Sequence, residues 1–110
     1  MFVSIRKNYE FLNVYHRGKS YANKYLVMYI LDNQSPVSRF GITVSKKVGN
    51  SVIRHRVTRL IRESIRLNEK QFAIGYDIVI VARNTARGKM YKDIESAVLH
   101  LGRIHKIVEK

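Results

Sequence analysis

Residues 45–66 read SKKVGNSVIRHRVTRLIRESIR and hold seven of the chain's 21 basic residues but only one acid, Glu63. Apolar residues recur through the stretch at helical spacing, and Asn50 or Ser51, just after Gly49, can cap a helix at its N-terminus. The pattern predicts a helix over about residues 51–68. At about 100° per residue, one arc of that helix collects the apolar side chains: Ile53, Val57, Leu60, Ile61, Ser64 and Leu67.

The opposite arc of the predicted helix is basic. It carries what we call the arginine ridge: His55, Arg59, Arg62 and Arg66. Further basic residues flank the apolar arc or precede the helix: Arg54, Arg56, Lys46 and Lys47. A solvated helix face usually alternates acids with bases, since each i,i+4 ion pair stabilises a helix by about 0.2 to 0.5 kcal/mol. We therefore interpret the ridge as a surface that replaces the counterions of nucleic-acid phosphates. A merely solvated amphipathic helix is the alternative.

The composition of the whole chain agrees with a polyanionic partner. The net charge is +13 at pH 7, whereas about 2 to 8 is usual for a small domain. Such an excess favours nucleic acid first and an anionic membrane surface second, and a simply soluble basic protein is the remaining alternative. The 110 residues, 45% of them apolar, suffice for one domain over residues 1–110 with its own core.

The chain shows no membrane or export pattern. No apolar run approaches the roughly 18 residues that span a bilayer, and the first residues lack the apolar stretch of a signal peptide. The absence of cysteine fits a reducing compartment. We therefore expect a cytoplasmic protein without a membrane partner.

Other periodic stretches predict the rest of the fold. Asn8 is a candidate N-cap for a first helix, and Gly18 stands where such a helix would end. Together the patterns predict helices over 8–17 and 90–108 and strands over 24–32, 39–46 and 76–83. The order α-β-β-α-β-α, with room for one more strand within 33–46, predicts a small α/β sandwich of helices against a sheet.

The residues that could carry catalysis are not grouped. The four histidines make no metal-binding motif, and the eight acids are not clustered as a nuclease with its own magnesium requires. We therefore predict a binder with no catalytic residue and no metal site of its own. His55 as a general acid or base is kept as an alternative.

Aromatic residues allow two interpretations. Phe11 and Tyr15 are one helical turn apart, and Tyr25, Val27, Tyr29 and Leu31 share one side of the strand over 24–32. Beside a basic surface, aromatic rings can stack bases of a single RNA strand. Spacing alone slightly favours the other interpretation, in which Phe11 and Tyr15 are ordinary core residues.

The stretch FGITVSKKVGNSVIRHRVTRLIRESIR, residues 40–66, resembles the protein subunit of bacterial ribonuclease P. That family has a strand ending in Ser-Lys-Lys, then Gly-Asn, then a helix with Arg-Asn-Arg and further arginines. The matching residues here are Ser45, Lys46, Lys47, Gly49, Asn50, Arg54, Arg56, Arg59 and Arg62. The chain departs at His55, where the family usually has asparagine, and at Thr58, where lysine is common. The resemblance continues upstream through KNYEFLNVYHRGKSYANKYLVMYILD and downstream through YDIVIVAR.

The resemblance implies a fold and a task. The fold is an α+β sandwich like domain 2 of ribosomal protein S5, with a left-handed βαβ crossover through the basic helix. The task is to assist, as an RNA-binding cofactor, the magnesium-dependent removal of the 5′ leader from precursor tRNA by a catalytic RNA, one protein per RNA. The Mg²⁺ is expected mainly on the RNA. A structural ribosomal protein and a stand-alone endonuclease are the alternative functions.

The resemblance also implies site residues. The expected contacts with the catalytic RNA are Lys46, Lys47, Asn50, Arg54, His55, Arg56, Arg59, Arg62 and Arg66. The residues expected to line a cleft for the precursor-tRNA leader are Phe11, Tyr15, Val27 and Tyr29.

Overall fold

A computed structural model describes residues 2–109 of the chain. Its elements in chain order are β1 (Val3–Ser4), α1 (Asn8–Arg17), β2 (Lys19–Ala22), β3 (Leu26–Asp32), β4 (Arg39–Thr43), α2 (Ser51–Asn68), the 3-10 helix η1 (Glu69–Gln71), β5 (Tyr76–Ala82), the 3-10 helix η2 (Asn84–Ala86) and α3 (Tyr91–Ile104).

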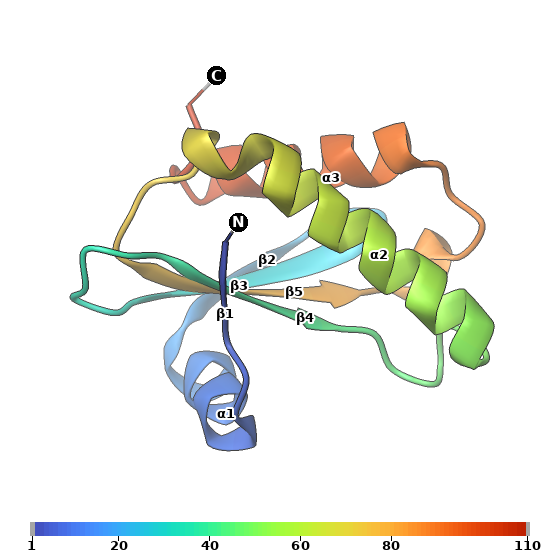
Figure 1. Cartoon of the computed structure of the whole chain (residues 1–110), viewed down its shortest axis with the longest axis horizontal. Coiled ribbons are helices and arrows are strands. Elements are labelled where there is room, and N and C mark those ends of the chain that lie inside the picture. The colour runs from blue at the N-terminus through green and yellow to red at the C-terminus, as the bar shows by residue number, and fades with distance from the viewer. Residues whose placement is uncertain (1, 110) are drawn as a thin grey trace.

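The strands form one mixed sheet in the order β1-β4-β5-β3-β2. β1, β4 and β5 are parallel to one another, and β3 is antiparallel to both β5 and β2. Helices α2 and α3 cover one face of this sheet, and α1 lies on the opposite face (Figure 1). The α+β sandwich expected from the sequence is confirmed.

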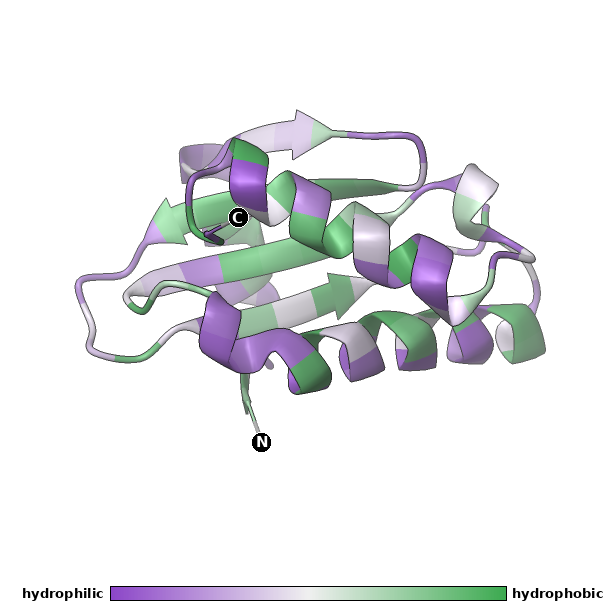
Figure 2. Cartoon of the chain, turned by 90° about the horizontal axis from the view of Figure 1, so that it is seen from above, coloured by the Kyte–Doolittle hydropathy of each residue, from purple (hydrophilic) through white to green (hydrophobic). Residues whose placement is uncertain are grey.

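The connection from β4 through α2 into β5 is the unusual part of the topology. Figure 2 looks down on the helix layer, with β4 and β5 both pointing to the right and β5 lying above β4 in the view. From the end of β4 the chain rises towards the viewer, runs back along α2 and descends into β5. If the view is turned so that both strands point upward, with α2 still in front of the sheet, β5 lies to the left of β4. The crossover is therefore left-handed. Right-handed connections dominate among parallel strands, so only the family resemblance predicted this hand.

The main core lies between the sheet and the two covering helices. Val57, Ile61 and Ile65 of α2 are fully buried there with Ile94 and Leu101 of α3. The sheet adds alternate residues of its central strands, namely Leu26, Met28, Ile78 and Ile80. A smaller cluster under α1 is built on Ile5, Val14 and Val79. α1 is therefore held by a much smaller apolar contact than α2 and α3.

Helices α1 and α2 have the predicted limits, with one correction at a cap. Asn50 caps α2, because its side-chain oxygen accepts a hydrogen bond from the Ile53 amide at 3.0 Å. The cap of α1 is Lys7 and not Asn8, since the Lys7 amide donates to the Glu10 carboxylate at 3.2 Å and closes the first turn. Gly18 ends α1, where a Cβ would lie 2.6 Å from the carbonyl oxygens of Val14 and Ile30.

Three predicted segments extend two or more residues beyond the observed ones, and the predicted limits at residues 83 and 90 are each one residue too far out. The strand expected to begin at residue 24 begins at Leu26, because the Asn23 side chain accepts hydrogen bonds from the amides of Tyr25 and Leu26 and forms a turn. β4 ends at Thr43, just before a turn in which the Val48 amide donates to the Ser45 carbonyl. The last helix ends at Ile104, beyond which the amides of residues 107 and 108 fold back onto the Gly102 carbonyl.

Two further predictions were wrong. Leu67 is 56% exposed, because α2 packs against α3 as well as the sheet and its buried arc turns towards Ile65 and Asn68. The short strands β1 and β2 were missed, and the space left for another strand within 33–46 is a loop up to β4. Within residues 2–109, no helix is long and apolar enough to cross a membrane.

Candidate RNA interface

The basic side of α2 faces solvent. His55, Arg59, Arg62 and Arg66 are exposed, as is the neighbouring Arg56. Arg54 is half-buried, and its Nε is buried without a hydrogen-bond partner. An open hollow of about 490 Å³ lies on the first turns of α2, lined by Ser51, Val52, His55, Arg56 and Arg59. The arginine ridge predicted from the sequence is thus an accessible surface.

The loop before α2 presents two more cations. Lys46 and Lys47 are exposed, while Val48 beside them is buried and anchors the loop. Gly49 packs directly on the first turn of α2, where a Cβ would lie 2.7 Å from Cγ2 of Ile53. The loop therefore adds its lysines next to the N-terminal end of α2, whose free amides also attract anions.

One ion pair within residues 2–109 involves the arginine ridge. Glu63 pairs with Arg66, with Nη2–Oε2 and Nε–Oε1 distances of 2.5 and 2.9 Å. This hydrogen-bonded pair lowers the pKa of Glu63 and raises the pKa of Arg66. Other ion pairs among residues 2–109 join only Arg39 to Glu10 and Asp77. Arg56, Arg59 and Arg62 consequently keep their charges available for an outside anion.

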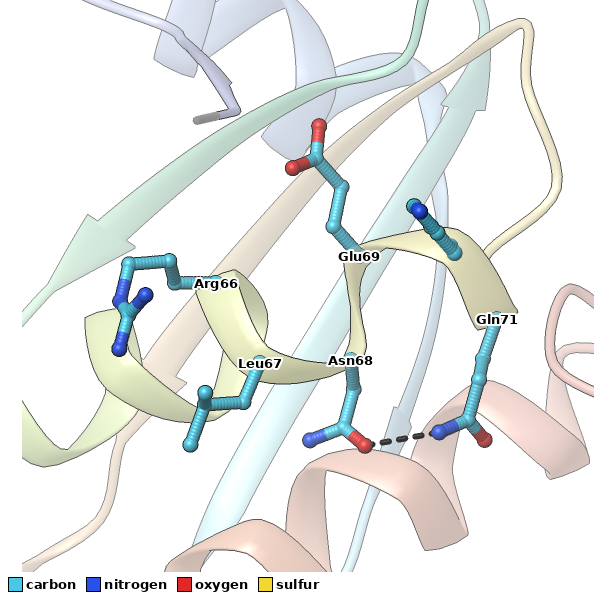
Figure 3. A pocket seen from close by; sticks show the side chains of 6 residues that line it. Arg66, Leu67, Asn68, Glu69 and Gln71 are labelled. Atoms are coloured by element: carbon cyan, nitrogen blue, oxygen red, sulfur yellow. Dashed lines mark hydrogen bonds between the residues drawn. The ribbon is translucent and has the colours of Figure 1, made fainter.

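The C-terminal end of α2 is different in character. A hollow of about 650 Å³ lies there beside Arg66 and Leu67, and the amide of Gln71 donates to Oδ1 of Asn68 at 2.8 Å (Figure 3). The Asn68 amide donates in turn to the Ser64 carbonyl and to Glu95 of α3. Asn68 thus joins α2 to α3. Arg66 at this end is paired with Glu63, whereas Arg56, Arg59 and Arg62 make no ion pair within residues 2–109.

An aromatic surface lies on the other side of the sheet. The rings of Phe11 and Tyr15 on α1 have centroids 6.5 Å apart, and Tyr15 meets Tyr29 of β3 edge-on at 5.0 Å. All three are half-buried, and Val27 is half-buried two residues before Tyr29 on β3. The structure therefore brings the three rings together beside Val27. The three rings are therefore neither fully buried in the core nor fully exposed to solvent.

One strand sets the position of α1 on the sheet. Three alternate residues of β4 touch it: Arg39 bonds Glu10, Gly41 lies under Phe11, and Thr43 Oγ1 is 2.8 Å from the hydroxyl of Tyr15. A Cβ on Gly41 would lie only 2.6 Å from Cε1 of Phe11. The ring of Phe11 can therefore rest on the sheet only because this residue is glycine.

Arg39 carries an ion-pair network that the sequence did not reveal. Its Nε and Nη2 donate to the two oxygens of the buried Asp77 at 2.9 and 2.7 Å, and its Nη1 donates to Glu10 at 2.6 Å. Asn33 adds a 2.9 Å hydrogen bond to Asp77. The Arg39 bond lowers the pKa of Glu10, and both carboxylates raise the pKa of Arg39. An acid inside the apolar run YDIVIVA was the only sequence feature pointing to this network.

Two acids of α3 accept hydrogen bonds within the fold. Glu95 accepts from Tyr91 at 2.9 Å and from Asn68, and Asp93 accepts from the Met90 amide. Over residues 2–109, no three His, Asp or Glu side chains are close enough together to hold a metal ion. The structure thus presents two distinct surfaces on opposite faces of the sheet: a cationic one on α2 and an aromatic one formed by α1 and β3.

The fold and these two surfaces define a small basic α+β domain with a cationic crossover helix and a half-buried aromatic surface. The family model described as Ribonuclease P matches residues 2–105 of the chain. The chain is 57% identical over 105 residues to the ribonuclease P protein component of Lachnoclostridium phytofermentans, covering 96% of this chain and 90% of that protein. It is also 57% identical over 98 residues to that of Clostridium botulinum strain 657, covering 88% of each.

Solved structures give the same result. The structure of the Staphylococcus aureus RNase P protein superposes with a TM-score of 0.89 at 33% identity, over 99% of this chain and 100% of that one. The RNase P protein from Thermotoga maritima gives a TM-score of 0.85 at 28% identity, over 97% and 98% of the two chains. The chain belongs to the ribonuclease P protein family.

Family membership implies a subunit of ribonuclease P, an endoribonuclease holoenzyme with a role in the maturation of precursor-tRNA 5′ ends. It also implies association with the ribonuclease P RNA. Membership in this family decides against the alternative function, a structural ribosomal protein.

Proposed function

We propose that the chain is the RNA-binding cofactor of ribonuclease P, which binds the catalytic RNA through α2 and the preceding loop and holds the 5′ leader of precursor tRNA on its aromatic surface. The observation that carries this proposal is the separation of the two surfaces. On one side of the sheet the ridge presents Arg59 and Arg62, which make no ion pair within residues 2–109, and half-buried rings lie on the other side.

The cationic surface suits the RNA backbone. Each phosphate that a basic residue neutralises releases counterions, which favours binding and makes it depend on salt. Arginine also matches phosphate oxygens with two parallel hydrogen bonds. We assign this contact to Lys46, Lys47, Asn50, Arg54, His55, Arg56, Arg59, Arg62 and Arg66. Asn50 also caps α2, so its side-chain oxygen is already engaged and its amide nitrogen is the group left for RNA.

The aromatic surface suits an unpaired strand. A single-stranded leader exposes bases that stack on aromatic rings with little regard for sequence. Phe11, Tyr15 and Tyr29 offer a connected series of rings, with Val27 beside them. β4 leads from Thr43, beneath Tyr15, directly into the loop with Lys46 and Lys47. A leader on the rings would thus reach phosphate-binding cations at the end of that strand.

The magnesium ions of the reaction are assigned to the RNA. Bound there, they would supply the activated nucleophile and charge stabilisation for phosphodiester hydrolysis. The acids within residues 2–109 do not offer a group of three for such an ion. In this proposal the protein contributes charge screening and substrate binding, one copy per RNA, and no catalytic group of its own.

A reconstitution experiment tests the proposal. The purified protein is mixed with a bacterial ribonuclease P RNA and precursor tRNA at low magnesium, and cleavage at the mature 5′ end is followed. We expect stimulation only when the RNA is present. Cleavage by the protein alone would instead indicate a stand-alone endonuclease, and absence of stimulation with the RNA would overturn the proposal.

A further inference from the structure

A second group of basic residues lies away from α2. Residues 45–66 carry seven basic residues against one acid, so about half of the net charge of +13 lies elsewhere. Lys24 stands in the turn between β2 and β3, and Arg83, Arg87 and Lys89 stand in the connection from β5 to α3. Because β3 is antiparallel to β5, the start of β3 and the end of β5 lie at the same end of the sheet.

Two of these cations are held on one aromatic ring. The ammonium groups of Lys24 and Lys89 lie 5.7 and 5.3 Å from the centre of the Tyr25 ring. The ring attracts each ammonium group and so favours the positions in which both lysines lie beside Tyr25. Neither lysine makes an ion pair within residues 2–109. Two like charges near one ring repel each other, and a bound anion would relieve that repulsion.

The backbone around the ring is firmly connected. Asn23 donates to the Ala97 carbonyl of α3 at 2.9 Å, and its own carbonyl accepts from Arg83 Nη1 at 2.6 Å. The Thr85 hydroxyl donates to the Lys24 carbonyl. The turn before β3 is thus tied both to α3 and to the connection after β5. The backbone of the turn that carries Lys24 is therefore held in place before a ligand binds, which lowers the ordering cost of binding to that of the side chains.

An open hollow adjoins the ring. It measures about 310 Å³ and is lined by Tyr25 and Lys24 on one side and by Ser96 and His100 of α3 on the other. Asp93 also lines it, but its carboxylate accepts the Met90 amide at 3.1 Å and makes no ion pair. The hollow gives a ligand access to Lys24 and to Tyr25, the ring that Lys89 also contacts.

We propose that Lys24, Tyr25 and Lys89, which we call the lysine–tyrosine patch, bind phosphodiester groups of an RNA strand at a site separate from α2 and from the aromatic surface. The proposal rests on the proposed function for the class of ligand. β4 and β5 are parallel, so the loop with Lys46 and Lys47 lies at the same end of the sheet as the patch (Figure 1). An RNA that passes over this end can contact both. The source of the strand is either the catalytic RNA or the precursor tRNA.

Salt dependence tests the patch. The variant Lys24→Gln with Lys89→Gln removes both charges, and Lys19→Gln with Lys70→Gln removes two charges from exposed lysines outside it. Binding is measured in two arms, protein to catalytic RNA and assembled holoenzyme to precursor tRNA. In one arm, the slope of log affinity against log salt should fall by about 0.7 to 0.9 for each lost phosphate contact. Slopes equal to those of the control in both arms would overturn the proposal.

Cross-linking gives a second, independent measurement. The chain has no cysteine, so Lys24→Cys places a single thiol at the patch for a photoreactive label. We expect cross-links to the RNA identified by the salt experiment, as for a label at Arg59→Cys on the ridge. Cross-links from position 59 without any from position 24 would count against the patch while leaving the proposed function intact. Failure of the unmodified protein to stimulate the RNA would instead count against the proposed function.

Discussion

Phe11 shows how a single residue can serve both packing and binding. Its ring rests on Gly41, yet the residue is only half-buried, so part of the ring is open to a ligand. Spacing in the sequence slightly favoured a core role, because a helical turn between two aromatics is common in cores. Burial distinguishes the two roles, and burial depends on the distant Gly41, which the local pattern of residues 8–17 could not reveal.

Phe11→Ala should weaken binding of precursor tRNA by the holoenzyme more than binding of mature tRNA. Loss of one stacked base costs about 1 to 3 kcal/mol, which corresponds to about 5- to 150-fold in affinity. Leu12→Ala, on the exposed side of the same helix, is the matched control. Equal losses for both tRNAs would show that Phe11 only packs α1 on the sheet.

His105 is the residue whose protonation the fold opposes. Its Nε2 lies 2.8 Å from the Met28 carbonyl, its Nδ1 is buried without a partner, and Tyr21 packs against its ring. Burial lowers its pKa below the ordinary value of 6.5, against the Met28 hydrogen bond, and nearby Lys19 lowers it further. The neutral imidazole is therefore the form that the folded protein prefers.

The pKa of His105 is lower in the folded protein than in the unfolded chain, so below about pH 6.5 the unfolded chain takes up the proton more readily. The free energy of unfolding should therefore be highest above about pH 6.5 and decrease as the pH falls below that value. Denaturant unfolding at pH 7.5 and 5.5 measures the difference. His105→Gln should reduce this pH dependence, whereas His16→Gln, at an exposed position, should keep it. An unfolding free energy that does not change with pH in the unmodified protein would contradict the assignment.

At the scale of elements, prediction succeeded where the determinants are local. The limits of α1 and α2 follow from apolar periodicity with Gly18 at one end and Asn50 at another, all within a few residues. β1 and β2 were missed because they are short edge strands whose exposed residues show no alternation. Their pairing partners lie elsewhere in the chain, as Val3 opposite Arg39 shows.

The site was predictable to the same extent. The ridge on α2 follows from helical arithmetic, because its residues share one element. The bidentate pair of Arg39 and Asp77 joins residues 38 positions apart and has no local pattern. The aromatic surface needed the family resemblance, since α1 and β3 meet only in the folded chain. The handedness of the crossover around α2 required it as well.

The arginines of the ridge on α2 should contribute together to binding the catalytic RNA. Arg59→Ala with Arg62→Ala should weaken binding to the catalytic RNA and lower the salt slope by about 1.4 to 1.8 if both contacts are lost, since each phosphate contact contributes about 0.7 to 0.9. Arg17→Ala with Arg103→Ala, two exposed arginines on other helices, is the matched control. An unchanged slope in the ridge variant would mean that these arginines do not contact phosphates.

At the scale of the whole molecule, the sheet separates the two surfaces. α2 and α1 lie on opposite faces, and the cation–π contacts within residues 2–109 do not join the arginine ridge to Phe11, Tyr15 or Tyr29. Distant sites without shared partners usually contribute independently to free energy. Binding of the catalytic RNA and of the leader should therefore be separable in one protein.

A double-mutant cycle measures this separation. Phe11→Ala should leave affinity for the catalytic RNA unchanged, and the ridge variant should leave the preference of the assembled holoenzyme for leader-bearing tRNA unchanged. In the combined variant, the affinity for the catalytic RNA should therefore match that of the ridge variant, and the leader preference should match that of Phe11→Ala, each within about 0.3 to 0.5 kcal/mol. A coupling clearly above 1 kcal/mol would show that the two surfaces act on each other.

The alternation along β4 has a consequence for how the chain tolerates insertions and deletions. Arg39, Gly41 and Thr43 hold α1 on one face, while Phe40 and Ile42 pack in the core on the other. A slip of one residue along the strand exchanges these two sets. It would put an arginine into the core and an apolar side chain under Phe11 in a single step. The register of β4 thus fixes the positions of the core residues, the aromatic surface and the start of the basic loop together. A change of register would displace all three at once.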